Sequence, residues 1–295
     1  MFVNAIEEVG RYTRPIHTIS RIYNDTSVTP GAATLFFVNE NGVAVTCKHV
    51  INVIGNRQAI NEHYNKFRAE KMAIGRNNKY NQRIKALEET YNYKPDALIQ
   101  LKELFVGVTT EPTSSYRWIN HPVYDLTILI FDNFKNPAYQ SYARFIKDSS
   151  ILKQGKFLCR LGFPFPEFTN YRYDEVTDDI EWTQTGQVET PRFPIEGMLT
   201  RHLMHERTIF GLELSTPGLR GQSGGPLFNT DGLVCGMQSS TNHLHLGFDM
   251  KNFELKTNGK TIRVNNQPFL NVGHCVHVDI IKDFLRQNNI KYYEE

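Results

Sequence analysis

The sequence lacks several features that mark large classes of protein. No run of about 18 apolar residues is present, so we expect no segment that spans a membrane. The formal net charge is only +2, which gives no electrostatic reason to expect a nucleic-acid partner. The N-terminal residues have neither the basic start nor the apolar middle of a secretory signal, so we expect a cytoplasmic protein.

Cysteine is scarce, and no two cysteines form a Cys-x-x-Cys pair. The four that are present are widely spaced: Cys47, Cys159, Cys235 and Cys275. Without an export signal, we expect reduced thiols in the core and no disulfide framework.

Histidine pairs raise the alternative of a metal site, because imidazole is a common zinc ligand. The pairs are His202 with His205, His243 with His245, and His274 with His277. None of them has a third ligand at a recognisable interval, so we expect neither a metal nor a cofactor.

The composition is that of an ordinary globular protein. Hydrophobic residues make up 40% of the 295 residues and charged residues 22%. This length suits one large domain or two of ordinary size, with enough chain to bury a core.

The most informative stretch is Gly221-Gln222-Ser223-Gly224-Gly225-Pro226. A serine hydroxyl is a weak nucleophile and needs a neighbouring base and donors for the oxyanion that forms. Glycines on both sides let the backbone turn its N–H groups inward. The run resembles the G-x-S-G-G-P signature of the trypsin/chymotrypsin-like serine peptidases. The resemblance implies that Ser223 is the nucleophile and that the N–H groups of Gly221 and Ser223 form the oxyanion hole.

Two further stretches resemble the rest of that family's catalytic triad. Asn41-Gly42 separates two apolar runs, which predicts a hairpin, and His49 follows the second run. Asp125 opens the apolar stretch up to Phe131, where a charge is costly unless it is used. Asp132, at the far end of the same stretch, is the weaker alternative. The chain order His49, Asp125, Ser223 is that of the chymotrypsin class, so we expect a serine endopeptidase that forms an acyl-enzyme.

The resemblance also implies the fold. We expect a mostly β protein of two antiparallel six-stranded β-barrels, residues 1–140 with His49 and Asp125 and residues 141–295 with Ser223. Helical spacing predicts an insertion of two helices at about 56–94 in the first barrel. An amphipathic helix is expected at about 279–289, with Asp279 as its N-cap.

A protein or peptide substrate is expected to bind beside the nucleophile. By resemblance, Ser239, Ser240 and Thr241 bind the substrate backbone as an added strand. Pro217, six residues before the nucleophile, carries no charge, so nothing favours a Lys or Arg side chain there. We expect Gly273 and His274 to reach the same pocket. Glutamyl-specific members of the family have a histidine near this place, so the resemblance implies an acidic or polar substrate side chain.

The sequence departs from the secreted members of the family. Gln222 stands where those members have an aspartate that pairs with a newly released N-terminus. The disulfide beside His49 is absent as well. Both departures resemble the bacterial HtrA-like branch, and we expect activity without N-terminal cleavage.

Two alternatives stay open. The insertion carries nine Lys or Arg residues against four Asp or Glu residues between Gly55 and Pro95. This charge fits a solvated face, or a docking surface for a regulatory, acidic partner. The chain would then be a latent peptidase, or a non-catalytic protein of the same fold that binds peptides.

Overall fold

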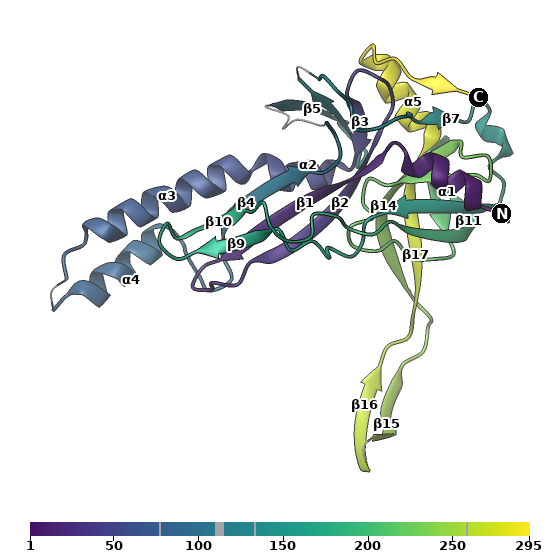
Figure 1. Ribbon diagram of the computed structural model, residues 1–295. Coiled ribbons are helices and arrows are strands. Elements are labelled where there is room, and N and C mark those ends of the chain that lie inside the picture. Colours follow the sequence, from purple (N-terminus) through teal and green to yellow (C-terminus); the bar gives the residue numbers. More distant parts are fainter. Residues whose placement is uncertain (77, 110–114, 133, 258) are drawn as a thin grey trace.

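The computed structural model describes residues 1–76, 78–109, 115–132, 134–257 and 259–295. Two sheets form the body of the molecule, and two long projections leave it in different directions (Figure 1). No helix in the described ranges is long and apolar enough to cross a membrane.

The first sheet holds six antiparallel strands in the order β4-β1-β2-β3-β6-β5. These are β1 (Thr13–Ile22), β2 (Thr29–Phe37), β3 (Val43–Thr46), β4 (Leu98–Phe105), β5 (Tyr116–Asn120) and β6 (Thr127–Phe131). Phe36 of β2 lies opposite Val45 of β3, which confirms the hairpin predicted at Asn41-Gly42. Among the described residues no pairing joins β4 to β5, so this sheet stays open.

The second sheet contains a closed ring of six strands. They are β8 (Phe157–Gly162), β11 (Phe193–His205), β12 (Thr208–Leu214), β13 (Pro226–Phe228), β14 (Val234–His245) and β17 (Phe269–His277). The ring closes because β13 pairs with both β8 and β14. Two short strands, β7 (Arg144–Phe145) and β18 (Tyr293–Glu294), extend the sheet with parallel pairings. The predicted fold, mostly β with two six-stranded units, is confirmed.

One hydrophobic core lies between the two sheets. Leu35 and Ile128 of the first sheet belong to the same buried cluster as Leu161 and Leu227 of the second. All four side chains are fully buried, so the two sheets share the free energy of burying apolar surface.

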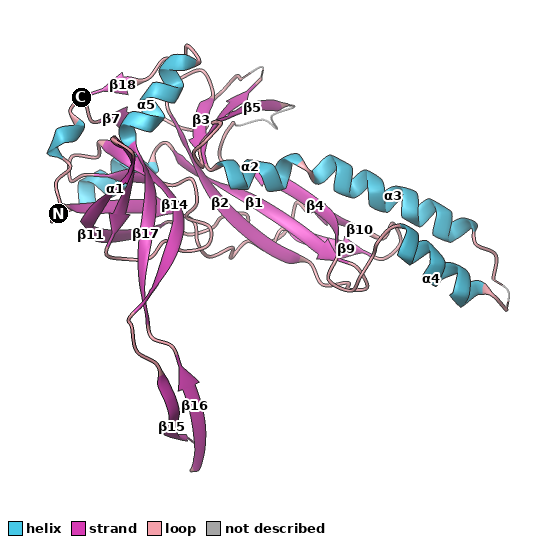
Figure 2. Ribbon diagram, turned by 180° about the vertical axis from the view of Figure 1, so that it is seen from behind, coloured by secondary structure: helices cyan, strands magenta, loops and turns pink. Residues whose placement is uncertain are grey.

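Two helices, α3 (Arg57–Ala73) and α4 (Tyr80–Thr90), form the predicted insertion and project from the first sheet (Figures 1 and 2). Tyr64 and Phe67 of α3 are buried in a separate cluster with Tyr23 and Ile99 of the body. The Tyr64 hydroxyl also donates to Asp178, in the turn between β9 (Tyr171–Asp174) and β10 (Asp179–Trp182). The base of the insertion is therefore anchored by aromatic packing.

The remaining helices are α1 (Val3–Gly10), α2 (Lys48–Gly55), the 3-10 turn η1 (Ser149–Ile151) and α5 (Val278–Gln287). The prediction that Asp279 caps α5 is wrong. His277 is the N-cap, and its Nδ1 accepts a hydrogen bond from the backbone N–H of Asp279. An imidazole can fill this role because its unprotonated nitrogen is an acceptor. Neither α1 nor β1 was predicted.

A second projection, which we call the arm, is the hairpin of β15 (Met250–Thr257) and β16 (Lys260–Asn266). It leaves the barrel where β14 ends and β17 begins (Figure 2). Phe253 lies opposite Val264 and Leu255 opposite Ile262, so one face of the arm is apolar. Phe253 is 50% exposed, which shows that this face lies in solvent.

The junction between the two sheets predicts a strong effect of one substitution. Gly224 has φ +87°, and a Cβ there would overlap the backbone oxygen of Thr34 and the hydroxyl of Thr46. Gly224→Ala is expected to lower the free energy of unfolding by about 2–5 kcal/mol, from left-handed strain plus overpacking. Urea denaturation measures this loss.

Gly155→Ala is the matched control for that variant. Gly155 has a similar φ of +92°, but a Cβ there meets nothing within 4 Å. It should therefore cost only the strain, about 1–2 kcal/mol. Equal losses in the two variants would contradict the packing argument.

Candidate active site

The loop that carries Ser223 is held by both sheets. It connects β12 to β13 without regular structure of its own. The N–H of Thr34, on β2, donates to the Ser223 carbonyl at 2.9 Å, and the Thr34 hydroxyl donates to the Gly221 carbonyl at 2.6 Å. From the second sheet, the Gln238 carbonyl accepts the N–H of Gly224 at 2.9 Å. The backbone around Ser223 is thus fixed from two sides.

The backbone N–H groups around Ser223 differ in whether they have a hydrogen-bond acceptor within the protein. Those of Gln222 and Gly224 donate to Leu219 and Gln238. Among the described residues, the structure records no acceptor for the N–H of Gly221 or Ser223. Gly221 reaches this geometry with φ +95°, a conformation that disfavours any other residue. Two donors without a protein acceptor next to a hydroxyl are what a developing oxyanion requires.

His49 is the second residue of α2, in the first turn of the helix and not on the end of a strand. Its backbone N–H donates to Asp125 Oδ1 at 2.9 Å, and its Nδ1 lies 2.8 Å from Asp125 Oδ2. A carboxylate next to Nδ1 holds the ring proton there and leaves Nε2 as the acceptor. The side chain of His49 is 52% exposed, so Nε2 is open to a ligand.

Asp125 lies just before β6 and accepts three hydrogen bonds: two from His49, and one from the Ser239 hydroxyl at 2.6 Å. Burial raises the pKa of this carboxyl, but the bonds from His49 and Ser239 outweigh burial and lower it to about 2. Asp125 is therefore ionised at neutral pH. Asp132, the alternative, contacts Arg117 and Ser115 at the far end of β6.

Ser239 connects the acid to the serine. Its hydroxyl donates to Asp125, and its carbonyl accepts the Ser223 hydroxyl at 3.4 Å. No hydrogen bond between Ser223 and His49 is recorded in the described residues. The structure thus brings Ser223, His49 and Asp125 to one place, with the hydroxyl directed at a backbone oxygen.

Cys47 also lies in this cluster. Its Sγ, a ring nitrogen of His49 and an oxygen of Asp125 lie within 4.8 Å of one another. Burial raises the pKa of the Cys47 thiol well above its usual value, and the thiol donates to the Gln238 carbonyl. Because metals bind the thiolate, a protonated donor thiol fits a hydrogen-bonded cluster better than a metal site.

A pocket of about 240 Å³ adjoins Asp125 and Ser239. Its lining residues are Val123, Tyr124, Asp125, Leu203, Phe210, Ser239, Ser240, His274, Cys275 and Val276. His274 lines it as well, but its Nε2 lies 3.2 Å from Glu213 Oε2. The imidazole expected to meet the substrate is therefore already paired with an acid.

Pro217, Thr241 and Gly273, which were also predicted to bind substrate, do not line this pocket. The Thr241 hydroxyl donates to the Gly218 carbonyl, next to Pro217, at 2.7 Å. A Cβ on Gly273 would overlap the guanidinium of Arg160. Arg160 was missed at the sequence level, because nothing in the strand Phe157–Gly162 separates a buried arginine from one that faces solvent.

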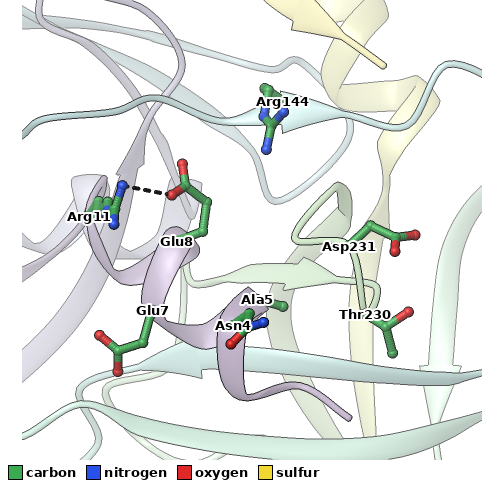
Figure 3. A pocket seen from close by; sticks show the side chains of 8 residues that line it. All are labelled: Asn4, Ala5, Glu7, Glu8, Arg11, Arg144, Thr230 and Asp231. Carbon is green, nitrogen blue, oxygen red and sulfur yellow. Dashed lines mark ion pairs between the residues drawn. The ribbon is translucent and has the colours of Figure 1, made fainter.

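A larger pocket of about 480 Å³ lies beside α1 (Figure 3). Asn4, Ala5, Glu7, Glu8, Arg11, Arg144, Thr230 and Asp231 line it. Arg11 pairs with Glu8 within it. It mixes both signs of charge and contains none of the predicted site residues.

Comparison with known families decides what this chain is related to. A model of the trypsin-like peptidase domain matches residues 33–237, which is more than half of the chain. The chain belongs to the trypsin-like peptidase family. The match includes His49, Asp125 and Ser223, so all three lie within the domain that defines the family.

Solved structures of HtrA-type proteases are similar to this trypsin-like peptidase domain. One is the HtrA-type protease AlgW with a decapeptide, at 10% identity and a TM-score of 0.49, covering 97% of this chain and 67% of that one. A variant of AlgW with a tripeptide gives 11% identity and a TM-score of 0.45, with 97% and 63% covered. A search of curated proteins gave no match.

The contact between Ser239 and Asp125 predicts a pH-dependent stability. Ser239→Ala removes a hydrogen bond to a carboxylate and should lower the free energy of unfolding by about 1.5–3 kcal/mol at pH 7. Asp125 has a depressed pKa, so this contribution is complete above about pH 4 and is lost as the pH falls towards about 2. Urea denaturation at several pH values measures it.

Ser240→Ala is the control, because the neighbouring Ser240 is exposed. It should change stability little at any pH. A loss in Ser239→Ala that is the same at pH 2 and pH 7 would show that the hydroxyl does not act through the ionised carboxylate.

Proposed function

We propose that the protein is a serine endopeptidase that hydrolyses peptide bonds through His49, Asp125 and Ser223. The observation that carries this proposal is the pair of hydrogen bonds between Asp125 and His49. An ionised carboxylate on Nδ1 sets the tautomer in which Nε2 can accept a proton. The proximity of Ser223, through Ser239, supplies a nucleophile for that base.

The steps follow from these roles. Ser223 Oγ attacks the substrate carbonyl carbon, and His49 Nε2 takes the hydroxyl proton. The N–H groups of Gly221 and Ser223 hold the oxyanion, each worth roughly 2.7–4 kcal/mol of barrier. His49 then gives its proton to the leaving amine, and the acyl group stays on Ser223. His49 then takes a proton from a water molecule whose oxygen attacks the acyl carbon, and returns it to Ser223 Oγ as the ester bond breaks and the acid product leaves. Asp125 offsets the imidazolium charge in both halves.

The side chain of Gln222 supports activity without N-terminal cleavage. It is fully buried, its Oε1 accepts the N–H of Leu219, and its Nε2 donates to the Phe193 carbonyl. Because Gln222 is uncharged and both ends of its amide are bonded, it needs no terminal amine as a partner.

A second candidate function is a latent form of the same peptidase. Two observations favour it: Ser223 donates to Ser239 and not to His49, and Thr241 is bonded to Gly218 across the predicted substrate position. In this form a substrate or partner must first break these contacts. A regulatory partner at the helical insertion would engage α4, of which no residue is buried.

Labelling with a fluorophosphonate probe tests the proposed function. The parent protein should be labelled and Ser223→Ala should not, because the probe reacts only with an activated serine. Asp125→Asn should lower the rate of peptide hydrolysis by about 10⁴-fold, the magnitude general for this triad, since the amide favours the wrong tautomer. Unfolding measurements check that both variants are folded.

The result also separates the two candidates. Prompt labelling of the isolated protein indicates a constitutive enzyme. Labelling that becomes faster only when peptides are added indicates the latent form. Absence of labelling under every condition would overturn the proposal and favour a non-catalytic, peptide-binding protein.

A further inference from the structure

Arg160, on β8, is one of the largest fully buried side chains among the described residues. No carboxylate among the described residues forms an ion pair with it. Burial lowers the pKa of its guanidinium, which reflects the cost of keeping the charge away from water. A buried cation without a counter-ion is expensive, so its presence needs a reason.

The partners of the guanidinium are all neutral. Nη1 donates to Gln238 Oε1 at 2.8 Å, and Nη2 donates to the hydroxyl and the carbonyl of Thr216 at 2.6 and 3.1 Å. Nε is buried and has no hydrogen-bond partner in the described residues. A guanidinium carries five N–H donors, so this one is incompletely satisfied and lacks an anion.

The guanidinium lies directly behind the nucleophile loop. Gln238, which it contacts, exchanges backbone hydrogen bonds with Gly224 and Gly225 and precedes Ser239. Gln238 therefore links the guanidinium of Arg160, through its side chain, to the backbone around Ser223, through its own backbone.

Two glycines allow the side chains of Arg160 and Gln238 to approach the backbone closely. A Cβ on Gly273 would overlap Arg160 Nη1, and a Cβ on Gly218 would overlap the carboxamide of Gln238. The carboxamide lies between Gly218 and Ser240, and its Nε2 donates to the Ser240 carbonyl at 2.8 Å. The hydrogen bond from the Thr241 hydroxyl to the Gly218 carbonyl joins the two chain segments on either side of this carboxamide. Gln238 thus places a neutral amide oxygen where a carboxylate oxygen would suit the guanidinium better.

We propose that Arg160 determines substrate specificity by binding the carboxylate of a Glu or Asp residue whose carbonyl Ser223 attacks. This proposal rests on the serine-peptidase function. The acidic side chain enters between Gly218 and the Ser240–Thr241 strand and replaces Gln238 Oε1 on Nη1. A planar carboxylate with two oxygens matches the fork of the guanidinium, and its charge offsets the buried cation.

His274 is the competing source of such specificity, and the structure argues against it. Its ring is already paired with Glu213, which also pairs with Arg201. Within the described ranges the other buried cations, Arg21 and Lys282, are paired with carboxylates, and Arg160 is not.

Hydrolysis of paired peptides tests the role of Arg160. The peptides differ only in Glu or Gln before the scissile bond, so size and shape are matched. The parent protein should show a kcat/KM about ten- to a hundredfold higher for Glu, the range for a hydrogen bond to a charged group. Arg160→Met should remove this preference, and Arg160→Lys, which keeps the charge, should restore part of it. Unchanged fluorophosphonate labelling shows that the triad is intact in each variant.

Gln238→Glu is a second variant that keeps Arg160 in place. It supplies an internal carboxylate to the guanidinium and should abolish the preference for Glu even if Arg160→Met does not fold. A preference for Glu that survives in Arg160→Met or in Gln238→Glu would overturn the proposal, and so would equal hydrolysis of the two peptides by the parent protein.

Binding separates this inference from the proposed function. Fluorescence anisotropy of product-like peptides that end in Glu or in Gln is measured with Ser223→Ala, which needs no turnover. Selective binding of the Glu peptide without any fluorophosphonate labelling of the parent supports the role of Arg160 and contradicts the peptidase. Labelling of the parent without selective binding does the opposite.

Discussion

The geometry of the site depends on the hydrogen bonds made by Thr34. Its N–H and its hydroxyl bind two carbonyls of the nucleophile loop, and the same hydroxyl accepts the N–H of Phe163 from the second sheet. Its own carbonyl accepts the hydroxyl of Thr46, three residues before His49. One fully buried residue therefore fixes the loop that carries the serine relative to β3, the strand that leads into the helix of the histidine. Buried hydrogen bonds hold such a position because breaking one leaves an unsatisfied polar group.

A half-buried carboxylate, Asp125, and a fully buried guanidinium, Arg160, lie near Ser223 and have opposite kinds of partner. Asp125 receives three donors, so its charge is stabilised and its pKa falls to about 2. Arg160 receives only neutral acceptors, and one of its donors has none. The carboxylate of Asp125 finds its hydrogen-bond donors within the protein, which suits a group that orients a base through every catalytic cycle. The guanidinium of Arg160 has no anionic partner, which suits a group that meets its counter-ion only when substrate is bound.

Local signals in the sequence predicted local structure well. The run from Gly221 to Pro226 and the Asn41-Gly42 turn act over a few residues, and the family match includes both. His49 was expected at the end of the hairpin but lies in the first turn of a helix, because β3 stops at Thr46 and the buried residues that follow, Val50, Ile51 and Ile54, have helical spacing. β1 escaped prediction since its arginines and proline hide the alternation of a buried strand. The environment of Arg160 could not be predicted, because Thr216, Gln238 and Gly273 reach it only through tertiary packing.

The arm has a consequence for how the protein behaves in concentrated solution. Its two strands pair only with each other among the described residues, so both outer edges carry free backbone donors and acceptors beside an apolar face. An isolated two-stranded ribbon is marginally stable in water and is a template for pairing with another chain. Arg263 is paired with Glu254 on the same hairpin, but Lys251, Lys256 and Lys260 counter this tendency, because positive charges along an edge repel a second copy of the same edge. Resistance to self-association at low ionic strength thus depends on three lysine side chains that take no part in the barrel, and added salt weakens their repulsion.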